Sequence, residues 1–374
     1  MCSSLSEGRF CTKSTGKPSL SLFLSRRTAA DDSSTDWRQD MNNLLKTRLT
    51  YCLSAAALFA GVHGSAQALT LGVDFAGSYT AASLGSIAGL PTPYGGLTLK
   101  AGSPNTLLIG GAANTDAGLI YELGVTRDAG NHIIGFTGSP AAIGTVGTYN
   151  DGGVTYGPGG VLFTSQWPVN KLGQTKPGST AEDKVIDLAP LGVADSHAAI
   201  NFVPAGFGGA GSMKLVSWAG GEWYNATYSP DGSGTFNIDS VTQIDLDLST
   251  GAMDNLPGGP EGFVYIAAGN AGFTVNSLLV SEYSAGNVAA YDLDANGNPL
   301  LNTRRDFITG LVGAEGAAID PVTGDFLFST FGGANEVIVV QGFTVPVGVP
   351  EPTTLALLGL ALAGLGFGRR QRAG

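Results

Sequence analysis

The sequence is poor in cysteine, histidine and charged residues. Its 374 residues include three cysteines and three histidines, and 13% of them are Asp, Glu, Lys or Arg. The cysteines, Cys2, Cys11 and Cys52, all precede residue 69, where we expect the mature chain to begin. The mature protein would then have no disulfide, no thiolate nucleophile and no cysteine metal site. A large domain can bury enough surface to be stable without disulfides.

Signs of long helices and of common catalytic motifs are also lacking. The 57 glycines argue against long helices, because glycine costs about 1 kcal/mol relative to alanine inside a helix. No G-x-S-x-G elbow, H-E-x-x-H motif or phosphate-binding loop is present. His132 lies in the apolar stretch NHIIGF, which is more typical of a strand than of a general base. We therefore predict no catalytic residue.

Basic residues are scarce between residues 69 and 345. This stretch contains eight Lys and Arg against twenty-four Asp and Glu, which gives a net charge of −16. Such a charge repels nucleic acid and anionic lipid, and it attracts cations or basic partners. We therefore expect no nucleic acid among the partners of this protein.

Residues 41–68 have the three parts of a secretory signal peptide. Lys46 and Arg48 form a basic n-region, and a mostly apolar stretch follows. Ala66 and Ala68 then form an A-x-A cleavage site, so the mature chain would begin at the next residue. The pattern predicts export through the Sec translocon and cleavage by signal peptidase. An ordinary N-terminal helix is the alternative.

Forty residues precede this segment. They are rich in Ser and Thr, carry charges and show no hydrophobic periodicity. We interpret residues 1–40 as an over-extended start, with Met41 as the true first residue, or as a disordered pre-segment.

The C-terminus combines an apolar segment with a basic cluster. Residues 353–368 carry no charge, and as a helix they would span about 24 Å, slightly less than the roughly 30 Å of the hydrocarbon core. Arg369, Arg370 and Arg372 follow directly and resist translocation. These features predict a single transmembrane helix with its C-terminus in the cytoplasm and the body outside the inner membrane.

Pro350-Glu351-Pro352 precedes this helix and completes a tripartite tail. The tail, residues 346–374, resembles the PEP-CTERM sorting signal of exopolysaccharide-producing Gram-negative bacteria. The resemblance implies recognition by an exosortase near Pro-Glu-Pro, a transient stay in the inner membrane, and final location in the cell envelope or outside the cell. The two prolines would keep the segment extended, as a protease cleft requires. A plain tail anchor is the alternative.

The body, residues 69–345, contains an internal repeat of short apolar strands separated by Gly, Asn-Gly and Asp-Gly turns. Each step of the repeat is long enough for one four-stranded antiparallel sheet. We therefore predict an all-β propeller of five blades, with a sixth blade or closure of the last blade by residues 69–75 as options. A β-sandwich is the alternative. The repeats open at Gly96, Gly153, Ala198, Gly262 and Gly316.

The last repeat carries a further resemblance. Residues 318–321 (Ala-Ile-Asp-Pro) and 324–328 (Gly-Asp-Phe-Leu-Phe) resemble blades of NHL and gluconolactonase-like propellers. In lactonase-like propellers a metal is held near the central channel, so the resemblance implies a channel site here as well.

Four residues occupy similar places next to the predicted innermost strands, namely Asp151, His197, Glu261 and Glu315. In a propeller these places face the central channel, where the four groups could converge on a cation. Hard oxygen ligands suit Ca²⁺ or Mg²⁺. The alternative is that they only bond backbone amides at the channel mouth.

Aromatic residues offer a second kind of site. Trp167, Trp218, Trp223 and Tyr224 could stack on sugar rings or fill the space between blades. Because no catalytic set is present, we predict a non-enzymatic structural or polysaccharide-associated binding protein. The alternative is a metal-dependent hydrolase or lactonase that uses Glu261 and Glu315.

Overall fold

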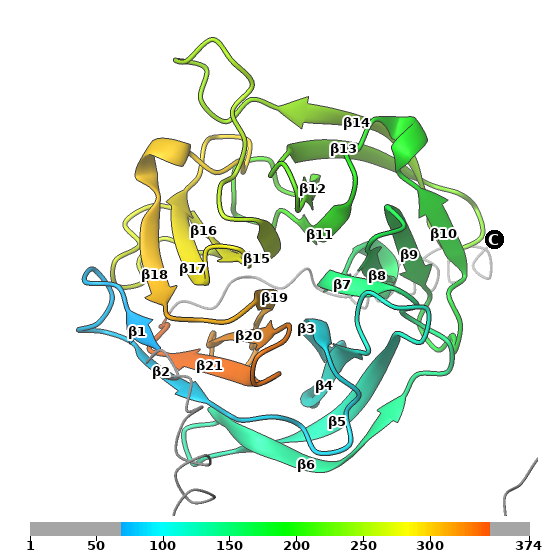
Figure 1. Cartoon of the computed structure of the whole chain (residues 1–374), viewed down its shortest axis with the longest axis vertical. Helices are drawn as coiled ribbons and strands as arrows, with labels where there is room; N and C mark the ends of the chain where they lie inside the picture. Colours follow the sequence, from blue (N-terminus) through cyan, green and yellow to red (C-terminus); the bar gives the residue numbers. More distant parts are fainter. Residues whose placement is uncertain (1–68, 345–374) are drawn as a thin grey trace, which may run out of the picture. The chain divides into compact units, whose positions relative to one another are not determined.

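Five antiparallel sheets stand like blades around a central axis in the part of the chain that the computed structural model describes, residues 69–344 (Figure 1). The five-bladed all-β propeller predicted from the repeat is therefore confirmed. The expected signal peptide and C-terminal transmembrane helix lie outside the described residues. Among residues 69–344, no helix has the length and apolar character needed to cross a membrane.

In blades 1 to 4 the four main strands run outward from the axis in chain order, and blade 5 takes its outer strand from the N-terminal segment. Blade 1 contains β3 (Tyr94–Lys100), β4 (Ser103–Gly111), β5 (Leu119–Arg127) and β6 (Ile133–Ala142). Blade 2 contains β7 (Asn150–Tyr156), β8 (Leu162–Gln166), β9 (Lys171–Thr175) and β10 (Lys184–Asp187). Blade 3 contains β11 (His197–Phe202), β12 (Met213–Ser217), β13 (Trp223–Pro230) and β14 (Phe236–Ile244).

Blade 4 contains β15 (Pro260–Ile266), β16 (Ser277–Glu282), β17 (Asn287–Asp292) and β18 (Arg305–Thr309). Blade 5 contains β19 (Ala314–Ile319), β20 (Phe326–Thr330) and β21 (Val337–Gln341). Short 3₁₀ turns lie at η1 (Pro158–Gly160), η2 (Ala189–Leu191) and η3 (Leu301–Thr303). Each predicted repeat opening lies on the innermost strand of its blade.

The N-terminal segment closes the ring differently from the expectation for residues 69–75. Strand β1 (Thr70–Leu71) adds to β18 in blade 4, and β2 (Thr80–Ser83) supplies the outer strand of blade 5 by pairing with β21. Phe75, between them, is buried, and its ring lies 4.9 Å from that of Phe307 in blade 4. This anchor holds residues 69–75 on blade 4, so the following strand reaches the last blade.

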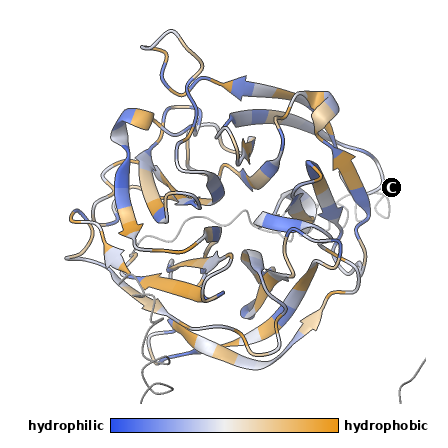
Figure 2. Cartoon of the chain, viewed as in Figure 1, coloured by the Kyte–Doolittle hydropathy of each residue, from blue (hydrophilic) through white to orange (hydrophobic). Residues whose placement is uncertain are grey.

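Hydrophobic side chains fill the spaces between blades. Five clusters within residues 69–344 each join neighbouring blades, and the one between blades 4 and 5 also takes in Phe75 and Tyr79. The blade strands are accordingly rich in hydrophobic residues, whereas β7 at the centre is largely hydrophilic (Figure 2). The blades therefore pack against one another through their hydrophobic faces, whereas backbone and polar groups line the axis.

A polar clasp also joins the first and last blades. The guanidinium of Arg127, at the end of β5, donates to both carboxylate oxygens of the buried Asp320 in the β19–β20 turn. His132 Nδ1 lies 2.6 Å from Asp325 Oδ2 in the same turn. His132 directly precedes β6 and pairs with this turn, and the expectation that it is not a base stays a prediction. The hydrogen bond with Asp325 raises its pKa.

The innermost strands approach each other so closely that side chains are excluded at their contact points. A Cβ on Gly316 of β19 would lie 2.6 Å from Gly96 Cα of β3, and one on Gly152 of β7 would lie 2.9 Å from the Gly262 nitrogen of β15. Serines on the second strands reinforce the ring, because Ser165 and Ser329 each donate to a carbonyl on the inner strand of the next blade. The axis is thus filled with backbone at this level.

Replacing Gly316 with Ala should destabilise the propeller by about 1–3 kcal/mol or more, because the new methyl group overlaps the backbone of blade 1. Chemical denaturation of the purified variant measures this loss. Gly77→Ala is the matched control, since a Cβ there meets no atom within 4 Å. Equal free energies of unfolding for the two variants would contradict the close packing at the axis.

Candidate cation site in the propeller channel

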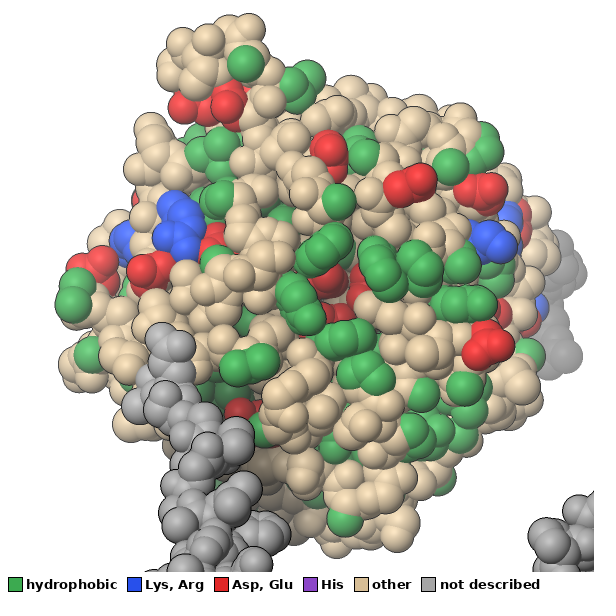
Figure 3. Space-filling model, viewed as in Figure 1, with side chains coloured by type: hydrophobic (Ala, Val, Ile, Leu, Met, Phe, Trp, Pro, Cys, Tyr) green, Lys and Arg blue, Asp and Glu red, His purple; other side chains and the backbone are tan. Residues whose placement is uncertain are grey.

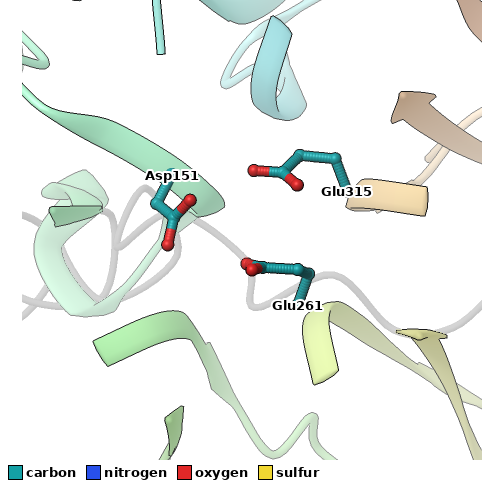
Figure 4. Close-up of side chains that lie close together, drawn as sticks. All are labelled: Asp151, Glu261 and Glu315. Atoms are coloured by element: carbon teal, nitrogen blue, oxygen red, sulfur yellow. The ribbon is translucent and has the colours of Figure 1, made fainter. Parts of the chain in front are cut away.

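Three carboxylates from three different blades meet at the axis. Asp151 comes from β7, Glu261 from β15 and Glu315 from β19, and Figure 4 shows their carboxyl groups pointing toward one another. One oxygen of each lies within 4.8 Å of the others. Two oxygens bound to one Ca²⁺ at 2.3–2.6 Å lie at most about 5 Å apart, so the group fits the spacing of Ca²⁺ ligands.

The strand register explains why these three residues converge. In each blade the first residue of the inner strand pairs with the last residue of the second strand, as Asn150 does with Gln166 and Pro260 with Glu282. The residue after it faces the channel. That position is held by Gly95, Asp151, Ala198, Glu261 and Glu315 in blades 1 to 5.

The carboxylates are buried with few compensating partners. Asp151, Glu261 and Glu315 are 1%, 4% and 1% exposed. No hydrogen bond of good geometry reaches either oxygen of Asp151, Oε2 of Glu261 or Oε1 of Glu315 from a described residue, although the nearby Asn114 side chain and Gly152 N–H lower the pKa of Asp151. None of the ion pairs formed within residues 69–344 includes any of the three.

Burial makes the charged form of each group unfavourable. It raises the pKa of Asp151 to about 7. Burial, and then repulsion from Asp151, raises the pKa of Glu261 well above its usual value. The pKa of Glu315 is raised for the same reason, with repulsion from both neighbours. Without a cation, the cluster must therefore hold protons near neutral pH.

His197, the fourth residue expected at this site, lies outside the group of carboxylates. It is the first residue of β11, so it matches Asn150 and Pro260 rather than Asp151 and Glu261. A shift of one residue along a strand turns the side chain to the opposite face. Its ring nitrogens lie 3.3 Å from the Lys171 carbonyl and 3.0 Å from the Ala199 carbonyl, and burial lowers its pKa to about 4.

Four aromatic rings surround the mouth of the site. Trp167, Trp218, Tyr283 and Phe331, the aromatic collar, each follow directly after the second strand of blades 2 to 5. Together with Asn114, Glu261 and Glu315 they line a cavity of about 170 Å³. Figure 3 shows acidic side chains at the bottom of a hollow that hydrophobic side chains surround. The cavity therefore has an acidic floor and an aromatic wall.

The structure divides the aromatic residues that the sequence singled out. Trp167 and Trp218 belong to the collar, whereas Trp223 and Tyr224 are buried in the blade interfaces. Sequence reasoning missed Tyr283 and Phe331. A repeated tripeptide could have indicated the collar: a serine near the end of the second strand, any residue, and then an aromatic residue. It occurs as Ser-Gln-Trp (165–167), Ser-Glu-Tyr (281–283) and Ser-Thr-Phe (329–331).

Solved structures with similar folds have low sequence identity to the chain. A putative gluconolactonase is 11% identical, with a TM-score of 0.37, over 70% of this chain and 92% of that one. Myxococcus xanthus glutaminyl cyclase is 12% identical, with a TM-score of 0.42, over 71% and 98%. The PQQ-bound aldose sugar dehydrogenase of Streptomyces coelicolor is 12% identical, with a TM-score of 0.34, over 69% and 84%. At this level the similarity concerns the fold and carries no argument about chemistry.

No curated protein sequence matches the chain. The family model described as the PEP-CTERM protein-sorting motif matches residues 348–372, which contain Pro350-Glu351-Pro352 and the arginine cluster. The motif implies processing by an exosortase, export and a location in the cell envelope. The chain is thus a five-bladed β-propeller that carries a PEP-CTERM protein-sorting motif at its C-terminus.

Proposed function

We propose that this exported protein binds a cation in its propeller channel and acts in the cell envelope by binding rather than by turnover. The observation that carries the proposal is the convergence of Asp151, Glu261 and Glu315, which are buried with unpartnered oxygens. Buried carboxylates in such a group favour a cation that replaces their protons. Ca²⁺ is the first metal ion to test, and Mg²⁺ is the second.

The lining of the cavity favours binding over catalysis. Glu261 and Glu315 would be occupied as cation ligands, and the remaining lining residues are Asn114 and the aromatic collar. Burial, and then the neighbouring carboxylates, raises the pKa of Tyr283, so its hydroxyl keeps its proton. No free general base then remains among the lining residues. We expect the partners to lie in the envelope or matrix, with exopolysaccharide as one candidate.

A metal-dependent hydrolase or lactonase is the second candidate. The raised pKa values of Glu261 and Glu315 favour it, because a buried carboxyl group that keeps its proton can act as a general acid. Turnover of a lactone or sugar ester by the purified protein, lost in Glu261→Gln and Glu315→Gln, would establish this alternative and overturn the binding proposal.

Ca²⁺ at 100 times its dissociation constant should raise the free energy of unfolding of the chelator-treated protein by about 2.7 kcal/mol. Glu315→Gln keeps the shape of the side chain but removes a ligand charge, so most of this gain should be lost. Asp239→Asn removes the same charge from an exposed position on β14 and should respond like the parent. The measurement is denaturant unfolding with and without Ca²⁺. An equal response of the parent and Glu315→Gln would contradict the assignment.

In chelator, the free energy of unfolding should fall as pH rises from 4 to 8. The pKa of Asp151 is raised from 3.8 to about 7 in the folded state, so its protonated form stabilises the fold fully below about pH 4. That contribution, about 4 kcal/mol at most, is lost as pH rises through 7. Asp151→Asn should lack this part of the fall, which unfolding curves at several pH values would measure. Identical slopes in both proteins would show that Asp151 does not titrate in this way.

A further inference from the structure

We propose that the ligand of this cavity is an organic ammonium compound, whose alkylated cationic group lies inside the aromatic collar above the three carboxylates. The inference rests on the proposed function, because it requires the carboxylates to attract a cation. It goes further by naming the class of cation and by giving the collar a role. A bare metal ion would use only the acidic floor.

The rings of the collar stand in an edge-to-face series around the axis. The centroids of Trp167 and Trp218 are 6.4 Å apart, those of Trp218 and Tyr283 6.2 Å, and those of Tyr283 and Phe331 5.9 Å. The angles between consecutive ring planes are 81°, 76° and 74°, close to the rotation between neighbouring blades of a five-fold ring. With five-fold spacing, each centroid lies about 5 Å from the axis, the distance at which a ring that turns its face to the axis makes a cation–π contact.

The collar has no aromatic ring at one blade. The equivalent residue in blade 1 is Ala112, directly after β4, and its φ of 49° disfavours a bulky side chain. Asn114, in the same loop, lines the cavity, and its Oδ1 makes no hydrogen bond to another described residue. The substituent attached to an ammonium group would leave the collar through this sector, where Asn114 can accept a hydrogen bond.

The charge of the site favours a cation over a neutral or anionic ligand. Three carboxylates lie beneath the collar, and Tyr283 lies close enough that all three of them raise the pKa of its hydroxyl. Residues 69–345 carry a net charge of −16, which also disfavours anions. Several aromatic faces around one point are the arrangement that recognises alkylated ammonium groups. A sugar ring needs only one such face.

The size of the cavity limits the ligand to one small group. Its volume of about 170 Å³ is below the roughly 300–1,000 Å³ of pockets that enclose drug-sized ligands. Trimethylammonium or a similar head group suits this space, whereas an oligosaccharide could place no more than its end there.

The test compares choline with 3,3-dimethylbutan-1-ol, which has the same shape but a neutral carbon in place of the nitrogen. Binding is measured on the purified, chelator-treated protein by calorimetry and by the fluorescence of the collar tryptophans. Choline should bind at least tenfold more tightly than the alcohol. Trp218→Leu should weaken choline binding about 3- to 30-fold, and Trp218→Phe should retain most of the affinity.

Several outcomes separate this inference from the proposed function. Equal binding of choline and the alcohol would overturn the ammonium assignment, as would glucose binding that is lost in Trp218→Leu while choline does not bind. If Ca²⁺ stabilises the protein and choline does not bind, the inference fails and the proposed function stands. If neither choline nor Ca²⁺ binds, both fail. A choline preference that depends on Trp218 supports the inference.

Discussion

The structure depends on the close approach of five inner strands at the propeller axis. At Gly96 and Gly316 the backbones of neighbouring blades, and at Gly152 those of blades 2 and 4 across the axis, come so near that a methyl group would overlap them. Hydrogen bonds from Ser165 and Ser329 to the next blade hold the strands at that distance. This close approach fixes the residues directly before the contact glycines, so that their side chains face the channel.

The carboxylate cluster is a direct consequence of this packing. Asp151, Glu261 and Glu315 precede the contact glycines, so their side chains must enter the narrow channel together. The fold itself does not need acidic residues there, because blades 1 and 3 carry Gly95 and Ala198 at the same position. Burying three like charges without partners costs several kcal/mol unless they are protonated or paired. This cost argues for a functional role for the cluster rather than a structural one.

The channel site and the C-terminal motif describe different aspects of the protein. The motif at residues 348–372 implies where the protein goes, through export and exosortase processing. The cavity, with its acidic floor and aromatic wall, is where we propose that the body binds its ligand. The cation site that we propose, in a body with few basic residues, suits a protein that meets small solutes in the envelope.

Much of the fold could be predicted because glycine marks the repeated contact at the axis. The openings at Gly96, Gly262 and Gly316 all lie on inner strands, and the acids before the last two were recognisable from the same pattern. Two features required strand register, which spacing alone does not reveal. His197 lies one position before the place that the carboxylates occupy on their strands, so its side chain points away from them. The collar residue Tyr283 is adjacent to the acids only because β16 runs antiparallel to β15.

The way in which the N-terminal segment closes the ring could also be predicted only in part from the sequence. Residues 69–75 have the pattern of a strand that could complete blade 5. Phe75 instead packs against Phe307 and holds this segment on blade 4, so Thr80–Ser83 completes blade 5 and closes the ring. That choice depends on long-range packing of aromatic rings, which no local pattern in the N-terminal segment shows.

The most direct test of the central claim is an anomalous difference map from crystals of the purified protein soaked in Mn²⁺. Mn²⁺ accepts oxygen ligands and scatters anomalously, so it reports where a hard cation binds. The account predicts one peak at the axis, within bonding distance of carboxylate oxygens from Asp151, Glu261 and Glu315. A map with no peak there, and with the three carboxyl groups hydrogen-bonded to one another, would contradict it.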